Sequence, residues 1–297
     1  MRKKTITRRD FLKVAAITPF TGAFACGLKS PQQEEAARKA KVVLVRDKNA
    51  LRSLHNPNFD VIQKMLDDAV STLFGEKDPA KAWKKIVKPS DVVGIKNNVW
   101  RPVSTTKEVE QAIKQRVMDV GVPEENIGIN DRGVRGHPVF QKATVLINAR
   151  PMRTHAWSGV GSLIKNYITF APNWSSYHGD SCADLASIWN DFNLKEKTKL
   201  NILVMLNPQF YNLGRHHYSD KYVWAYNGLL VGQDPVAIDT TGVRIIETKR
   251  REFFGRERPL QPSAKHIPLA DTRHNLGVSD PNRIEIIKLG WKEEILI

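Results

Sequence analysis

Residues 148–166 gather side chains that can bind an anion or move a proton. The segment reads NARPMRTHAWSGVGSLIKN and contains His155 and Lys165, which we predict to be catalytic. An imidazole exchanges protons near neutral pH, and a buried lysine can bind an anion or act as an amine with a lowered pKa. Glycine lets the backbone approach an anion closely, and a helix N-terminus offers it free N–H groups. The neighbours that we expect to bind the ligand or cofactor are Thr154, Gly159, Gly161 and Asn166.

The spacing of the glycines and the lysine in this segment fits neither a P-loop nor a dinucleotide-binding fingerprint. The residue types alone therefore leave other interpretations open. The glycines could form a structural turn, the histidine could be a hydrogen-bonded loop residue, and the lysine could lie on a helix surface.

Three polar residues outside this segment stand where a site group is expected. Lys96 ends a predicted strand, and ligands of α/β sheets bind at the carboxyl ends of strands. Asp239 lies inside a helix that begins at Asp234-Pro235, and a buried carboxylate facing a sheet needs a partner. We predict that Lys96 and Asp239 contact the ligand and that Asp234 is the helix cap. His178 is a candidate metal ligand, because neutral imidazole is the commonest one, and a polar loop residue is the alternative.

Some classes of site are excluded by what the sequence lacks. It has no Gly-x-Ser-x-Gly elbow and no His-Glu-x-x-His, which excludes serine hydrolases of that type and zincins. Its two cysteines, Cys26 and Cys182, allow no disulfide framework. They also exclude a cysteine-ligated iron–sulfur cluster, which needs about four thiolates. Asp131, after the strand that ends at Asn130, is interpreted as stabilising a glycine-rich turn, and a position in the lining of the cleft is the alternative.

The elements that must position these residues alternate between strands and helices. The strands are predicted at residues 41–46, 91–96, 127–130, 144–148, 200–206, 228–231 and 284–287. The helices are predicted at residues 59–74, 104–120 with Ser104 as cap, and from 235 onwards. This alternation predicts an α/β fold with a mostly parallel sheet flanked by helices, in a single large domain, with a small subdomain left open. The ligand is expected in the loops that follow Lys96, Asn130, Asn148 and Leu206.

The N-terminus reads as an export signal. Residues 1–25 combine Arg8-Arg9 in TRRDFLK with a weak apolar run and end in Ala-Phe-Ala, which predicts a twin-arginine signal peptide, with an ordinary Sec signal as the alternative. The expected partner is the twin-arginine translocase, and the expected location is the periplasm or outside the cell. Residues 26–40 are predicted to be a flexible tether and 41–297 the domain. Cys26 follows a degenerate lipoprotein box, so lipidation there and plain cleavage both stay open.

The net charge of +15 favours anionic partners, including an anionic small molecule. Nucleic acid is not expected, because the basic residues are spread along the chain and the protein is predicted to leave the cytoplasm. No stretch after the leader reaches the roughly 20 apolar residues of a membrane span. Contact with a membrane is therefore expected only through a lipid on Cys26.

Five segments, in order, resemble the signature of a bacterial and archaeal family called domain of unknown function 362. They are residues 92–98 (VVGIKNN), 148–166, His178 with Ala183-Asp184-Leu185, 232–239 (GQDPVAID) and 274–278 (HNLGV). The resemblance spans roughly residues 91–288. Arg153 stands where the family usually has lysine, and Asn207-Pro208 stands where it usually has an acidic residue and a Gly-Gly-Pro-like turn. Many members also carry a ferredoxin module, for which this chain lacks the cysteines.

The spacing of His155, Gly159 and Lys165 is also similar to that of a segment in nickel-pincer lactate racemases. In those enzymes the lysine holds a nucleotide-derived cofactor and a later histidine binds nickel, and His178 lies at a comparable distance downstream. The cofactor itself is not identified by these residues, and a metal and a nucleotide-derived cofactor both stay open.

Three hypotheses of function follow. The first is an exported protein that binds an anionic ligand or cofactor in a cleft, with redox or isomerase-type chemistry. The second is a non-catalytic binding or assembly protein for an envelope enzyme. The third is a member of the fold with a degraded site, which the missing acidic residue near Asn207 favours.

Overall fold

A sheet of eight strands organises residues 39–297, which are the residues that the computed structural model describes and which form one compact unit. Its strands are β1 (Ala40–Arg46), β4 (Val93–Lys96), β5 (Ile127–Asn130), β6 (Val145–His155), β7 (Gly159–Gly161), β8 (Thr198–Gln209), β9 (Gly228–Gly232) and β10 (Ile284–Gly290). A second, two-stranded sheet is formed by β2 (Leu51–Ser53) and β3 (Asn56–Pro57). The predicted signal, residues 1–25, and the predicted tether as far as residue 38 lie outside the described residues.

The order of the main sheet is β10-β1-β9-β8-β6-β4-β5, and β7 pairs with β6. The pairs β1–β10, β6–β8, β4–β6 and β4–β5 are parallel, whereas β9 runs antiparallel to both of its neighbours. Because β8, β6, β4 and β5 are parallel neighbours, their carboxyl ends meet at one edge of the sheet. The predicted α/β fold with a mostly parallel sheet is confirmed.

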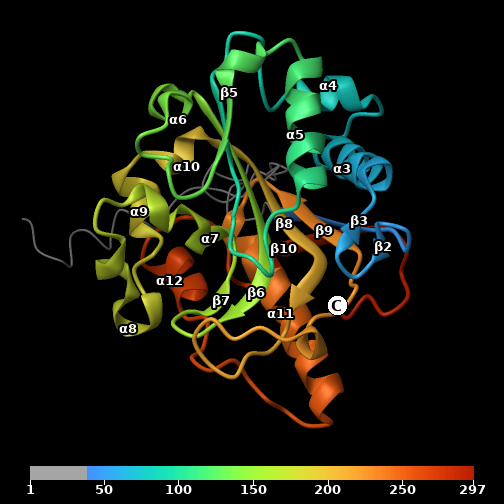
Figure 1. The fold of residues 1–297 in the computed structure, drawn as a ribbon, viewed down its shortest axis with the longest axis vertical. Coiled ribbons are helices and arrows are strands. Elements are labelled where there is room, and N and C mark those ends of the chain that lie inside the picture. The colour runs from blue at the N-terminus through green and yellow to red at the C-terminus, as the bar shows by residue number, and fades with distance from the viewer. Residues whose placement is uncertain (1–38) are drawn as a thin grey trace, which may run out of the picture. The chain divides into compact units, whose positions relative to one another are not determined.

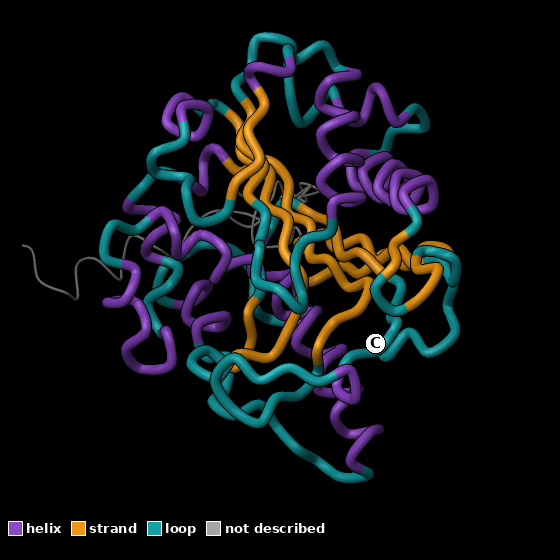
Figure 2. The backbone as a smooth tube through the Cα atoms, viewed as in Figure 1, coloured by secondary structure: helices purple, strands orange, loops and turns teal. Residues whose placement is uncertain are grey.

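Helices cover both faces of this sheet (Figures 1 and 2). The α-helices are α3 (Phe59–Phe74), α4 (Pro79–Trp83), α5 (Lys107–Asp119), α6 (Pro138–Lys142), α7 (Leu163–Asn166), α8 (Gly179–Cys182), α9 (Ser187–Asp191), α10 (Leu194–Lys197), α11 (Pro235–Phe254) and α12 (His266–Thr272). Short 3₁₀ helices lie at Glu124–Asn126, Tyr167–Phe170, Trp174–His178, Asp220–Tyr222 and Pro281–Arg283. Within residues 39–297, no helix has the length and apolar composition that a membrane span requires.

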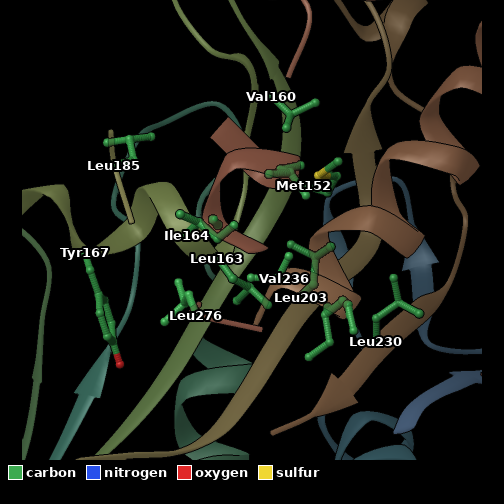
Figure 3. Close-up of a cluster of buried hydrophobic side chains, with 14 of the residues drawn as sticks. Met152, Val160, Leu163, Ile164, Tyr167, Leu185, Leu203, Leu230, Val236 and Leu276 are labelled. Atoms are coloured by element: carbon green, nitrogen blue, oxygen red, sulfur yellow. The ribbon is translucent and has the colours of Figure 1, made fainter. Parts of the chain in front are cut away.

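Two hydrophobic cores lie on the two faces of the sheet. Side chains of β6 point alternately to the two faces and so contribute to both cores. Val145, Ile147 and Ala149 point into the core shared with α3, α4 and α5, whereas Leu146 and Met152 point into the core shared with α7, α11 and α12. Figure 3 shows the second core around Leu163 and Ile164 of α7. These apolar side chains fix one turn of helix against β6 and α11, and the same turn carries Lys165 and Asn166.

The predicted bounds of α3 and the predicted start of α11 are confirmed, whereas the predicted bounds of α5 are not. Asp234 caps α11 by accepting hydrogen bonds from the N–H groups of Val236 at 2.8 Å and Ala237 at 3.0 Å, as predicted. The predicted cap Ser104 is wrong, since α5 begins at Lys107 and Thr106 caps it. Thr105, just before the cap, is bound to the sheet, because its hydroxyl donates to the Ala149 carbonyl of β6 at 2.9 Å.

The predicted end of a strand at Asn148 is also wrong. β6 continues for seven further residues to His155, and β8 likewise runs past Leu206 to Gln209. Pro151 interrupts the apolar run, but it is accommodated beside Val204 next to a bulge in the β6–β8 register. The ligand loops predicted after Asn148 and Leu206 therefore lie farther along the chain, after His155 and Gln209.

Candidate functional site

The helix turn that carries Lys165 is held by Asp239. Its carboxylate accepts hydrogen bonds from the hydroxyl of Ser162 at 2.7 Å and from the N–H groups of Leu163 and Ile164, both at 2.9 Å. Burial raises the pKa of Asp239 to about 6, although these hydrogen bonds act in the opposite direction. The partner that this buried carboxylate requires is therefore the N-terminus of α7. Its contact with a ligand stays a prediction.

A network of amides joins α7 to the sheet. Asn166 of α7 donates to the side-chain oxygen of Asn148 at 2.8 Å and to the Lys96 carbonyl at 3.1 Å. Asn148 in turn donates to the Leu163 carbonyl and to the side chain of Asn201 in β8. The side chain of Asn166 is thus used inside the protein, where it fixes α7 across β4, β6 and β8.

Lys96 is fully buried, and its three N–H donors are all used. They reach the Asn97 carbonyl at 2.8 Å, the Asp131 carboxylate at 2.6 Å and the Asn166 side chain at 3.3 Å. Burial lowers the pKa of Lys96 to about 8 against the opposing effect of Asp131, so the pair is ionic at neutral pH. Lys96 therefore stabilises the loop of Asp131 and the side chain of Asn166 through these hydrogen bonds. Its predicted contact with a ligand stays a prediction.

Asp131 has a different role from the one interpreted from the sequence. The glycine-rich turn is held instead by Asn130, whose side chain accepts from the Gly133 N–H at 2.8 Å. Asp131 pairs with Lys96 and also accepts from the Val99 N–H at 3.0 Å. Burial acts to raise the pKa of Asp131, but Lys96 and these hydrogen bonds outweigh it and leave the pKa below its ordinary value.

Two buried arginines of β6 are the main site residues that the sequence analysis missed. Arg150 is 4% exposed and Arg153 is 9% exposed, and the Nε of each has no hydrogen-bond partner among residues 39–297. Burial lowers the pKa of Arg150 to about 10 and that of Arg153 to about 9, so both stay cationic at neutral pH. The signal was present in the sequence, since both precede Thr154 in the segment of residues 148–166.

Lys165 completes this group of cations. It is 3% exposed, and its amine contacts the thiol of Cys182 at 3.5 Å. Burial lowers the pKa of Lys165 to about 8, with further lowering by the charges of Arg150 and Arg153 and an opposing contribution from the thiol. The structure therefore brings the predicted Lys165 together with the two unpredicted arginines.

Two neutral histidines adjoin these cations. His155 accepts a hydrogen bond on Nδ1 from the Trp157 N–H at 3.3 Å, and burial followed by the charge of Lys165 holds its pKa far below the ordinary value. His266, at the start of α12, is fully buried, and neither ring nitrogen has a partner in the described part of the chain. Burial and then Lys165 and Arg150 lower its pKa to about 3. A lone histidine in an amphipathic segment gave no sequence signal for this position.

A small hollow opens beside these groups at the carboxyl ends of β4, β6 and β8. Its lining residues are Trp100, Arg153, His155, Ala156, Trp157, Asn212, Arg215, His216 and His217. The guanidinium of Arg153 stacks on Trp100 at 3.9 Å and that of Arg215 stacks on Trp157 at 4.1 Å. Trp157 contacts both the hollow and the surroundings of Lys165. Its side chain lines the hollow, and its carbonyl accepts from the Cys182 thiol, which contacts Lys165, at 3.7 Å.

A larger cavity of about 270 Å³ lies beside the neighbouring residues of the β6–β7 hairpin. Its lining residues are Thr154, Gly159, Tyr211, Asn212, Arg250, Arg258, Pro259, Leu260 and Gln261. The hydroxyl of Thr154 is buried without a partner among residues 39–297. Thr154 and His155, predicted to act on one ligand, thus line different cavities that share Asn212.

The two predicted glycines are required for packing. Gly159 has φ +72°, and a Cβ there would lie 2.5 Å from the Pro262 carbonyl oxygen. A Cβ on Gly161 would lie 2.8 Å from a terminal nitrogen of Arg150. Gly161 therefore leaves room for the guanidinium, and its contact with a ligand stays a prediction.

His178 lies between two indole rings, 4.5 Å from that of Trp157 and 5.5 Å from that of Trp174. Burial and then the charge of Lys165 lower the pKa of His178. Residues 39–297 contain no group of three or more His, Cys, Asp or Glu side chains placed to hold a metal ion. The role of His178 as a metal ligand stays a prediction.

A sequence model of the family described as Domain of unknown function (DUF362) matches residues 94–244, half of the chain. The match runs from β4 into α11, so it contains Lys96, Arg150, Lys165 and Asp239, while His266 lies beyond it. No curated protein and no solved structure matches the chain.

Proposed function

The chain belongs to the family described as Domain of unknown function (DUF362), and we propose that this member binds a small anionic ligand or cofactor at the carboxyl ends of β4, β6 and β8. One observation carries the proposal. The Nε atoms of Arg150 and Arg153 and both ring nitrogens of His266 are buried without a hydrogen-bond partner in the described residues. Buried polar groups are normally paired, so this group favours a ligand that completes it.

The balance of charge gives the sign of that ligand. The carboxylate of Asp131 is paired with Lys96, and that of Asp239 caps α7. Arg150, Arg153 and Lys165 are left without a carboxylate partner within residues 39–297. Burying a cation costs several kcal/mol, and an anion with matching acceptors offsets much of that cost. A ligand with one or more carboxylate or phosphate groups meets this requirement.

The surroundings strengthen such an interaction. Trp100 and Trp157 each place an aromatic face against an arginine at the hollow. These rings limit the access of water, and charges interact more strongly where the local dielectric constant is low. His155 supplies a neutral imidazole at the same place, whose N–H can donate to an oxygen of the bound anion. We therefore propose redox or isomerase-type chemistry on the bound anion.

A non-catalytic binding or assembly protein is the second candidate. The observation that favours it is the depth of Lys165, which is 3% exposed and lines neither the hollow nor the larger cavity. A deeply held ligand suits storage or delivery as well as turnover. If the purified protein converts the bound anion into a product, the enzyme function is supported and the non-catalytic function is excluded.

Titration of the purified full-length protein with inorganic phosphate and with oxalate tests the proposal, by calorimetry at low ionic strength. We expect binding to at least one of them, and Arg150→Gln should weaken it about tenfold, because one charge-assisted hydrogen bond is lost. Arg132→Gln, which replaces an exposed arginine of the neighbouring loop, should leave the affinity unchanged. Native mass spectrometry and an absorption spectrum would reveal an anion or cofactor that copurifies. If neither anion binds and none copurifies, the proposal is wrong.

We also propose that residues 1–25 export the folded protein through the twin-arginine translocase to the periplasm, with Cys26 as a site for lipid attachment. Replacing both Arg8 and Arg9 by lysine is expected to leave the protein in the cytoplasm with its leader uncleaved. Fractionation and immunoblotting give the readout, and lipid on the mature N-terminus is read by mass spectrometry. Unchanged export of the double variant would indicate the Sec route.

A further inference from the structure

Two buried lysines in this protein share a lowered pKa but differ in their contacts. Lys96 donates to a carboxylate, a carbonyl and an amide oxygen, which uses all three of its N–H donors. The amine of Lys165 has the Cys182 thiol, at 3.5 Å, as its partner in the described residues. A thiol is a weak acceptor, so the amine of Lys165 is available for a further reaction partner.

The position of Lys165 suits a nucleophile. Asp239 holds the turn of helix that carries it, and Leu163 and Ile164 anchor that turn in the core. The positive charges of Arg150 and Arg153 both lower the pKa of Lys165. Neighbouring cations therefore favour the neutral amine, which is the nucleophilic form. Within residues 39–297, no carboxylate forms an ion pair with the amine of Lys165, so no such pair stabilises its protonated form.

We propose that Lys165 forms an imine with a small 2-oxo acid, whose carboxylate is held by Arg150 and Arg153. This step rests on the proposed anion site, because the same arginines bind the ligand. The requirement for a carboxylate next to a carbonyl follows from the arrangement: cations for the acid group adjoin an amine for the carbonyl carbon.

The reaction is a condensation without any redox change. The neutral amine of Lys165 adds to the carbonyl carbon, and one of its two N–H protons passes to the carbonyl oxygen to give a carbinolamine. The remaining N–H proton passes to the hydroxyl as the C–O bond breaks, so that water leaves and a C=N bond remains between Lys165 and the former carbonyl carbon. One water molecule is released for each imine formed, and hydrolysis returns both reactants.

His155 is placed to polarise the carbonyl of the ligand. It lines the hollow, and its Nδ1 accepts a hydrogen bond from the Trp157 N–H. The proton of the neutral ring is therefore assigned to Nε2, whose N–H can donate a hydrogen bond that polarises first the carbonyl and later the departing hydroxyl. His155 then acts on the rate of imine formation more than on the binding of a plain anion.

Borohydride trapping tests the inference on the full-length protein. The protein is incubated with glyoxylate, the smallest 2-oxo acid, and sodium borohydride, and tryptic peptides are analysed by mass spectrometry. We expect a reduced adduct on Lys165 and none on Lys96, the matched buried lysine of the same chain. Lys165→Arg should abolish that adduct, His155→Asn should slow trapping about tenfold, and propanal, which lacks the carboxylate, should label Lys165 at least tenfold less than glyoxylate.

Binding of oxalate, which has no ketone or aldehyde carbon, is measured in parallel. If oxalate binds while glyoxylate leaves Lys165 unlabelled, the imine inference is wrong and the anion site stands. Equal labelling of Lys96 and Lys165 would also overturn it, since the contacts of the two amines would then make no difference. If neither compound binds or reacts, the inference fails together with the anion site.

Discussion

Replacing Asp239 by alanine is expected to lower the free energy of unfolding by about 3 kcal/mol, measured by chemical denaturation at pH 7. The change leaves the N–H groups of Leu163 and Ile164 and the hydroxyl of Ser162 buried without their acceptor. Each such group costs about 1–3 kcal/mol. Part of this loss is offset, because the variant no longer buries a carboxylate whose pKa is raised to about 6.

The matched control is Asp78→Ala. Asp78 also caps a helix, but it is exposed and accepts one N–H, that of Ala80 at 2.9 Å. Its removal should cost about 1 kcal/mol. The two variants should also differ in function, because only the loss of Asp239 releases the turn that carries Lys165. If Asp239→Ala is as stable as Asp78→Ala and binds anions normally, Asp239 does not hold α7 as described.

The second large effect is expected at Lys165. Lys165→Met should weaken anion binding by roughly 30- to 150-fold at pH 7, because a cation in a buried site contributes about 2–3 kcal/mol. The wild-type affinity should also fall as the pH rises through about 8, the value to which burial lowers the pKa of Lys165. Above that pH the amine of the free protein is neutral, and binding must first restore its proton.

The same shift has an opposite effect on the stability of the free protein. Between pH 8 and 10.5 the unfolded chain binds the proton of Lys165 and the folded chain does not, so the contribution of this group to stability increases with pH. Lys165→Arg, which stays charged throughout, should remove the fall in affinity near pH 8. Calorimetric titrations from pH 6 to 10 provide the measurement. A fall that persists in both variants would assign the titration to another group, such as Lys96.

Local sequence patterns determined most of the secondary structure. The apolar period of residues 59–74 predicts α3 with its observed bounds, and Asp234-Pro235 predicts the start of α11. Helix periodicity and helix caps depend on residues within one or two turns of each other, so they can be recognised from neighbouring residues in the sequence. The end of β6 was not predictable in this way, because its last residues are strand only through pairing with β8 and with β7, formed elsewhere along the chain.

For the site, the sequence determined the segment and the residue types, and the tertiary structure decided what each side chain contacts. Residues 148–166 contain the predicted Lys165 and His155 together with Arg150 and Arg153, which were not predicted, and five segments that include these residues predicted the family. The partners, however, are remote: Ser162 and Asp239 are separated by 77 positions, and Lys96 and Asn166 by 70. Burial gives Lys96 its internal partners and leaves the Nε of Arg150, the Nε of Arg153 and both ring nitrogens of His266 without a partner in the described residues. Burial is a property of the packed sheet and helices rather than of any local pattern.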